Sequence, residues 1–195
     1  MKKLFIALLA SLLVLVGCGS TKELEKKELT ITHNLGETEV TTNPEKVVIF
    51  DLGVLDMFDA LELNVTAVPK SNLSDNLKKY ESDDYVNAGT LFEPSFEDLA
   101  EHGPDLIIIS GRAAKNYDEL SKIAPTISLD TDNKDFMESV YNRLDVIAQI
   151  FPEAKENIDK EVETLKADIE TLKTSAAAVE GETLFLLANG DSIVL

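Results

Sequence analysis

One arginine stands out among the residues that could bind a small molecule. Arg112 follows a strongly apolar run, and only Ser110 and Gly111 separate it from that run. In open α/β sheets, ligands bind beyond the carboxyl ends of the strands. A guanidinium there offers a planar set of donors that suits an anion, and a glycine permits close approach of the backbone. The sequence therefore predicts an anion-binding position at Arg112. A surface ion pair with Asp118 or Glu119 is the alternative.

Further candidate ligand contacts lie in loops that would surround Arg112. Each also has an ordinary structural interpretation, because loop lysines are commonly solvated and a tyrosine packs as readily as it stacks. Phe92 could supply an aromatic wall, and a second polar turn at residues 51–53 follows another apolar run. The candidates are Leu52, Lys70, Phe92, Lys115 and Tyr117.

The sequence lacks the patterns of catalytic and metal sites. It contains no nucleophile elbow, no phosphate-binding loop and no zinc-binding helix with paired histidines. Its two histidines, His33 and His102, are predicted at the surface, and they are too few to bind a bare metal ion together with carboxylates. The acidic runs at residues 81–84 and 130–135 lack the spacing of a calcium loop. We therefore expect binding without catalysis and without a resident metal or cofactor.

The composition narrows the class of protein. Of the 195 residues, 44% are hydrophobic and 28% are charged, which is enough apolar content for a packed core. Collagen, coiled-coil and disulfide-rich classes do not fit this composition. The chain has 18 Lys and Arg against 36 Asp and Glu, a net charge of −18. Such a surface repels phosphate backbones, so nucleic-acid binding is disfavoured.

The first 17 residues have the pattern of an export signal. Lys2 and Lys3 precede an apolar run over residues 4–16. As a helix this run would rise about 20 Å, less than the roughly 30 Å hydrocarbon core of a membrane. The sequence LVGC at residues 15–18 resembles the lipobox of bacterial lipoproteins, which implies a lipid anchor on Cys18 at the extracytoplasmic face of the cell membrane. A free cysteine after an ordinary signal is the alternative. Since Cys18 is the single cysteine, we expect no disulfide.

From residue 29 onward, strand and helix patterns alternate. A polar–apolar alternation on both sides of residues 34–37 predicts a hairpin. Short, wholly apolar runs predict buried parallel strands, and segments of helical spacing lie between them. The predicted strands are residues 46–50, 65–68, 105–110 and 126–129, and the predicted helices are residues 53–64, 96–102 and 117–123. This alternation favours a parallel α/β sheet with right-handed crossovers.

Two amphipathic helices follow the predicted sheet. The first carries an apolar face made of Phe136, Val140, Leu144, Ile147 and Phe151. The second begins at residue 152 and keeps an apolar stripe for more than twenty residues, with a coiled-coil seam as the alternative to packing on its own domain. Residues 183–188 and 192–195 then predict new strands. Because a domain seldom ends partway through a sheet, we expect this sequence to be a fragment of a longer, two-lobed protein.

Several blocks resemble the iron-siderophore substrate-binding lipoproteins of ABC importers, in the helical-backbone metal receptor superfamily. The pattern is nearest to catecholate binders of gram-positive type, including the petrobactin-type proteins. The blocks are residues 43–48, 53–56, 87–94, 96–97, 104–108 and 110–112. The resemblance implies a class III periplasmic-binding-protein fold, in which one long helix joins two α/β lobes. It also implies that Arg112 contacts a ferric siderophore and that Glu97 docks to the permease. Some catecholate binders carry a basic residue where this chain has Phe92, which leaves Arg112 as the main cation.

The resemblance implies a function and a division of the chain. We expect a monomeric lipoprotein that captures a ferric siderophore, of catecholate type, and delivers it to an ABC importer permease without chemical change. A vitamin B12 or haem carrier of the same superfamily, an exported enzyme and a non-transport surface lipoprotein are the alternatives. The predicted parts are a signal peptide (1–17), a lipid-anchored tether (18–28), an N-terminal lobe (29–151), an interlobe helix (152–180) and the start of a truncated C-terminal lobe (181–195).

Overall fold

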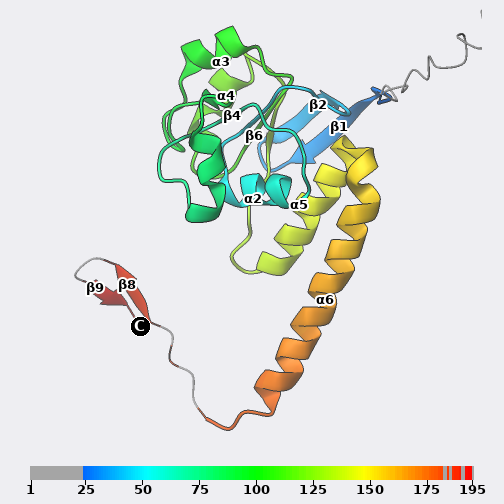
Figure 1. Cartoon of the computed structure of the whole chain (residues 1–195), viewed down its shortest axis with the longest axis vertical. Coiled ribbons are helices and arrows are strands. Elements are labelled where there is room, and N and C mark those ends of the chain that lie inside the picture. Colours follow the sequence, from blue (N-terminus) through cyan, green and yellow to red (C-terminus); the bar gives the residue numbers. More distant parts are fainter. Residues whose placement is uncertain (1–23, 182–183, 185, 190–191, 195) are drawn as a thin grey trace, which may run out of the picture.

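A parallel sheet of five strands forms the centre of the computed structural model, which describes residues 24–181, 184, 186–189 and 192–194 (Figure 1). The strand order is β5-β4-β3-β6-β7, and every neighbouring pair is parallel. The strands are β3 (Val47–Ile49), β4 (Ala67–Val68), β5 (Val86–Asn87), β6 (Leu106–Ile109) and β7 (Thr126–Ser128). The predicted parallel α/β sheet is thus confirmed. The very short β5 was not predicted, because it has no apolar run.

Helices cover both faces of the sheet, and the strand residues alternate between the two layers. Val47 and Ile49 belong to the core beneath α2 (Leu52–Ala60) and α5 (Phe136–Ile150). Val48 and Phe50 belong to the core beneath α3 (Phe96–His102) and α4 (Tyr117–Leu120). Because both faces are covered, the central strands are apolar throughout, which is why they read as continuous apolar runs in the sequence.

The chain reverses its direction of travel across the sheet at β3. It passes from β3 through α2 to β4 and on to β5, and it then returns through α3 to β6 on the other side of β3. The carboxyl ends of β3 and β6 therefore meet at a topological switch point, where open α/β sheets bind their ligands. The polar turns that follow these two strands, at residues 51–53 and 110–112, lie side by side there.

A hairpin covers the β7 edge of the sheet. It consists of β1 (Glu28–His33) and β2 (Gly36–Thr41), as predicted, and its inward residues Ile31 and Val40 join the core under α5. Thr38 Oγ1 donates to the carbonyl of Thr126 at 2.8 Å, which ties the hairpin to β7. An exposed sheet edge would be open to pairing with other chains, and the hairpin protects it.

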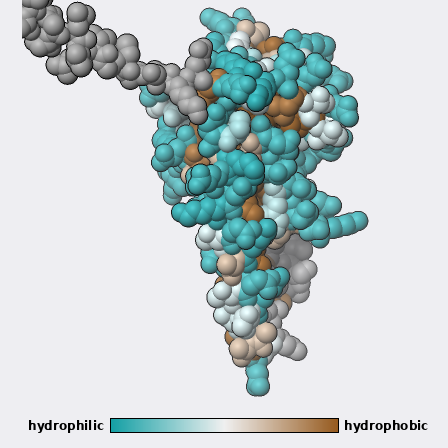
Figure 2. Space-filling view, turned by 90° about the vertical axis from the view of Figure 1, so that its right-hand side faces the viewer, coloured by the Kyte–Doolittle hydropathy of each residue, from teal (hydrophilic) through white to brown (hydrophobic). Residues whose placement is uncertain are grey.

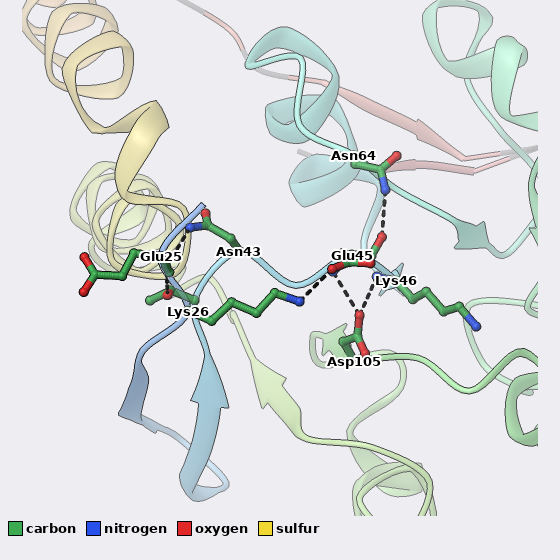
Figure 3. Close-up of polar contacts among 8 residues, drawn as sticks. Glu25, Lys26, Asn43, Glu45, Lys46, Asn64 and Asp105 are labelled. Atoms are coloured by element: carbon green, nitrogen blue, oxygen red, sulfur yellow. Dashed lines mark hydrogen bonds and ion pairs between the residues drawn. The ribbon is translucent and has the colours of Figure 1, made fainter. Parts of the chain in front are cut away.

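The segment before the hairpin is bound to the amino ends of the strands. Thr42 Oγ1 and Asn43 Nδ2 donate to the carbonyl of Glu25 at 3.1 and 3.3 Å, and Lys26 Nζ contacts Glu45 Oε1 at 2.7 Å (Figure 3). A surface hollow of about 630 Å³ lies among these residues. Among the described residues, Glu25 is thus hydrogen-bonded to the lobe, and it belongs to the predicted tether of residues 18–28.

Asp105 and Asn64 hold the same edge of the sheet together. Asp105 Oδ2 accepts from the backbone nitrogens of Glu45 and Lys46 at 2.9 and 2.8 Å, and Asn64 Nδ2 donates to the carbonyl of Glu45 at 2.7 Å (Figure 3). These bonds join the residues that precede β3, β4 and β6. The amino edge of the sheet is therefore occupied by internal contacts, whereas the candidate ligand residues lie at the carboxyl edge.

A long helix leaves the lobe after α5. The short turn η3 (Pro152–Ala154) leads into α6 (Lys155–Ala177), which extends away from the sheet (Figure 1). Its apolar stripe is buried only near its start, at Ile158, while Leu172 is 67% exposed. The predicted helix is therefore present; its stripe stays half-buried at Val162, Leu165 and Ile169, and Lys166 lies over the ring of Tyr141 on α5. Beyond it, β8 (Leu187–Asn189) and β9 (Ser192–Val194) form an antiparallel pair, which overlaps in part with the strands predicted at residues 183–188 and 192–195.

The surface of the lobe is largely hydrophilic, with small separated apolar patches (Figure 2), in keeping with the net charge of −18. None of the described helices has the length and hydrophobicity needed to cross a membrane. The predicted signal peptide and Cys18 lie outside the described residues.

Candidate functional site

A buried aspartate joins the two strand ends at the switch point. Asp51 is the N-cap of α2, and its Oδ1 accepts from the backbone nitrogen of Val54 at 2.9 Å. Its Oδ2 accepts a hydrogen bond from Ser110 Oγ at 2.5 Å, which links the end of β3 to the end of β6. Asp51 is an N-cap because a carboxylate satisfies the free backbone donors at a helix start. The turn that carries Arg112 is thereby fixed to the neighbouring turn.

Arg143 is the buried partner of Asp51. It reaches down from α5, and its Nη1 lies 3.4 Å from Asp51 Oδ1, with both side chains at least 90% buried. Gly53 makes room for this pair, since a Cβ there would lie 3.2 Å from Asp51 Oδ1 and 3.4 Å from Arg143 Nη1. The Nε of Arg143 is buried and has no hydrogen-bond partner among the described residues.

This network of Asp51, Ser110 and Arg143 was not predicted from the sequence. The available signal was a charged residue on an apolar helix face: Arg143 lies four residues before Ile147 and seven after Phe136. A buried charge needs a counter-charge, so an acid at a neighbouring strand end could have been sought. The sequence does not say which acid, because the pairing joins residues that are 92 positions apart.

The turn that carries Arg112 is held in place from the β7 side. Asp130 Oδ1 accepts from the backbone nitrogen of Gly111 at 2.6 Å, and Asp130 Oδ2 accepts from Asn34 Nδ2 at 2.7 Å. Arg112 itself is exposed and makes no ion pair with any described residue. The alternative of a surface ion pair is not realised with Glu119, which pairs with Lys122 instead. A fixed turn therefore presents a guanidinium whose charge no described carboxylate offsets at ion-pair distance.

The loop that carries Phe92 lies against the segment that follows Arg112. Asn116, in η2 (Ala114–Asn116), donates from Nδ2 to the carbonyl of Phe92 at 3.1 Å. The loop itself is a tight turn closed between Gly89 and Pro94. Phe92 is 55% exposed, and Lys115 on η2 is exposed as well. The structure thus brings Arg112, Phe92 and Lys115 to one region of the carboxyl edge.

Three other candidates make internal contacts. Lys70 Nζ donates to the carbonyl of Ser82 at 2.7 Å and so holds the end of η1 (Asp75–Glu81), a 3-10 helix that was not predicted. Tyr117 packs edge-on against His33, with ring centroids 5.6 Å apart, and thereby ties α4 to the hairpin. Leu52 is half-buried at the first position of α2 and packs against the core. Of these, Leu52 lies nearest in sequence to the Asp51 network.

The structure also shows the surroundings of Glu97 and of the two histidines. Glu97 is exposed in the first turn of α3. Burial lowers the pKa of His33, and burial together with nearby Lys46 lowers the pKa of His102. Both were predicted at the surface, and both are half-buried there and hydrogen-bonded to a threonine. Within the described ranges, no three His, Cys, Asp or Glu side chains converge as a metal site would require.

The arrangement suits binding of an anion by contact alone. It offers one exposed guanidinium on a rigid turn, one exposed lysine and one exposed aromatic ring, and these are groups that orient a charged, partly aromatic ligand.

The comparisons with known proteins all indicate the same family. The family model described as periplasmic binding protein matches residues 47–194. The petrobactin-binding protein YclQ of Bacillus subtilis (strain 168) is 38% identical over 200 residues, which cover 97% of this chain and 62% of YclQ. This chain therefore spans about 62% of the length of that relative.

Two solved structures share the fold. The crystal structure of YclQ superposes with a TM-score of 0.82 at 39% identity and covers 86% of this chain and 60% of that one. The periplasmic catecholate-siderophore binding protein VctP of Vibrio cholerae superposes with a TM-score of 0.76 at 32% identity, again over 86% of this chain and 60% of that one.

Proposed function

The chain belongs to the periplasmic binding protein family, and on that premise we propose that it captures a ferric siderophore of catecholate type for an ABC importer. The family model and the two superposed structures also establish the α/β fold of the class III binding proteins. One observation carries the proposal: Arg112 is exposed at the switch point of the sheet and makes no ion pair with a described residue. Support for the ligand class comes from YclQ and VctP, which are named for petrobactin and for catecholate siderophores.

Capture needs no chemistry on the ligand. A ferric catecholate carries negative charge on the iron-bound oxygens and presents aromatic ring faces around them. Arg112 can donate from its planar fork to those oxygens, and Lys115 adds a second positive charge. Phe92 offers a ring face for an aromatic contact. In this proposal the protein holds the chelator, and the chelator supplies all the iron ligands.

Two partners follow from the same proposal. Glu97, exposed on α3, is proposed to dock to the permease, and Cys18 is proposed to carry the lipid that keeps the protein at the extracytoplasmic face of the membrane. An unmodified Cys18, found by mass spectrometry in the mature membrane fraction, would contradict the lipid anchor.

A ligand titration tests the proposed function. The complete gene product, expressed without residues 1–18, is titrated with ferric petrobactin, a ferric hydroxamate, ferric citrate and cobalamin, and retention of each ligand is followed by co-elution and calorimetry. We expect selective retention of the ferric catecholate. Retention of cobalamin alone, or of none of these ligands, would contradict the proposal and leave the fold unaffected.

A further inference from the structure

The start of α5 extends beyond the carboxyl edge of the sheet. The helix runs antiparallel to the strands: the carbonyl of Ile150, at its end, accepts from the backbone nitrogen of Asn43 before β3. Two turns from its start, Arg143 is level with Asp51, where β3 has just ended. Seven residues of helix rise about 10 Å. The first residue of α5, Phe136, therefore lies past the strand ends, on the side where a ligand would bind.

Phe136 points the same way as Arg143. A separation of seven residues returns a helix to nearly the same direction, and helical side chains lean toward the N-terminus. Phe136 belongs to the apolar face that predicts burial, and residues further along this face, Ile147 and Phe151, are buried in the core. Phe136 is nevertheless 56% exposed. Its exposure follows from its position, because the sheet that covers the rest of this face ends before it.

The loop before Phe136 is attached to the turn that carries Arg112. Asp130, at the start of this loop, accepts from the backbone nitrogen of Gly111 at 2.6 Å. Further along, the backbone nitrogen of Asp132 donates to Ser139 Oγ at 2.7 Å, which binds the loop to the first turn of α5. Phe136 therefore has a short, hydrogen-bonded connection to the residue beside Arg112.

We propose that Phe136 is a ligand-contacting, specificity-determining residue, whose ring forms the second aromatic wall of the site. Phe92 belongs to the loop between β5 and α3 and is bonded to η2, on the α3–α4 face of the sheet, whereas Phe136 comes from α5 on the opposite face. Arg112, at the end of β6, lies between the two faces. A guanidinium between two exposed rings suits an anionic ligand with more than one aromatic ring, such as a ferric bis-catecholate. This inference rests on the proposed function and adds a selection for aromatic chelators to it.

Substitutions at Phe136 distinguish the contribution of the aromatic ring to ligand binding from the contribution of apolar bulk. In the complete gene product without residues 1–18, the Kd for ferric petrobactin is measured by calorimetry for wild type, Phe136→Ala, Phe136→Leu and Phe136→Tyr. We expect about tenfold weaker binding for Phe136→Ala, as loss of an aromatic contact implies. Phe136→Tyr should bind like wild type, and Phe136→Leu, which keeps apolar bulk without a ring, should resemble Phe136→Ala. Leu172→Ala is the matched control, since Leu172 is an exposed apolar side chain on the adjacent helix.

The outcomes distinguish this inference from the function on which it rests. If the wild-type protein binds ferric petrobactin and Phe136→Ala binds it with the same Kd, the inference is overturned and the proposed function stands. A Phe136→Leu variant that binds like wild type would also overturn it, because the ring would then be unnecessary. If wild type retains no ferric catecholate, both proposals fail. Thermal melting shows whether each variant folds. If Phe136→Ala does not fold, the Kd of Phe136→Leu is compared with that of Phe136→Tyr, and equal values would overturn the inference.

Discussion

Arg112 is an isolated positive charge on an acidic molecule. The net charge is −18, yet Arg112 has no ion-pair partner among the described residues and its turn is fixed by Asp130. Because the turn is already fixed, a bound ligand has to order only the side chain of Arg112 and not its backbone. This combination separates Arg112 from Lys70, whose ammonium group is engaged by carbonyls of the chain.

Removal of the Arg112 side chain should weaken ligand binding. We expect Arg112→Ala to raise the Kd for ferric petrobactin about 10- to 100-fold, the loss typical of a charge-assisted contact. Arg112→Lys should recover part of the affinity, because it keeps the charge and loses the planar fork. Calorimetry measures both. Lys122→Ala, which removes a surface cation paired with Glu119, is the control, and equal losses in both alanine variants would count against a specific role for Arg112.

Asp51 and Arg143 form a buried ion pair whose role is structural. Arg143→Met should lower the free energy of unfolding by about 3–5 kcal/mol, because it leaves a buried carboxylate without its counter-charge. The double variant Asp51→Asn/Arg143→Met should regain much of this loss, since it removes both charges. Urea unfolding followed by circular dichroism measures the difference. A double variant no more stable than the single one would show that the pair contributes through packing instead of charge.

Individual loops and helices decide where the candidate residues lie. The loop that carries Phe92 depends on Gly89, whose φ is +96° and where a Cβ would lie only 2.4 Å from the carbonyl oxygen of Glu93. L-residues rarely adopt this conformation, and here the backbone leaves no space for a side chain. The position of Phe92 is therefore set by a glycine three residues earlier.

Gly89→Ala should displace this loop and weaken ligand binding. Gly103→Ala is a matched control, because Gly103 also has a positive φ, +61°, but a Cβ there would meet nothing within 4 Å. We expect Gly103→Ala to cost about 1 kcal/mol of stability and no affinity. Gly89→Ala should raise the Kd for ferric petrobactin severalfold as well as lower the melting temperature. Unchanged affinity in Gly89→Ala would mean that the loop does not contact the ligand.

The ligand residues and the N-terminal segment of the lobe lie at opposite edges of the sheet. The ligand residues lie at the carboxyl ends of β3 and β6, and Glu97 is exposed on the first turn of α3. The segment at Glu25 and Lys26 is bound at the opposite, amino edge (Figure 3). A chain leaving the lobe at that edge does not obstruct the ligand residues.

Charge reversal at Glu97 should separate transport from binding. We expect Glu97→Arg to abolish uptake of ferric petrobactin by cells while the Kd of the purified protein stays unchanged, because like charges at a docking contact repel. Glu153→Arg, at an exposed acidic position on η3 and outside α3, should leave uptake intact. Radiolabelled iron uptake and calorimetry measure the two properties. Normal uptake in Glu97→Arg would refute the docking role.

The sequence by itself determined the local features of this protein. Continuous apolar runs such as residues 106–109 identify buried strands because the period of apolar residues reports which faces are covered. The same runs place Arg112 after a strand end. Gly103, with its left-handed backbone, marks the end of α3. The fold class, the hairpin and the long helix followed from such patterns. Segments without an apolar period, such as η1 and β5, gave no signal.

Only the tertiary structure decided which of these features meet. Asp51 pairs with Arg143 across 92 positions, Phe92 is bonded to Asn116, and Tyr117 packs against His33 of the hairpin. Phe136 shares its helix face with buried residues but extends past the end of the sheet. Periodicity records the local environment of a residue, whereas strand order and helix position set which ends of the elements come together. Those depend on packing of the whole chain, so no stretch of sequence contains them.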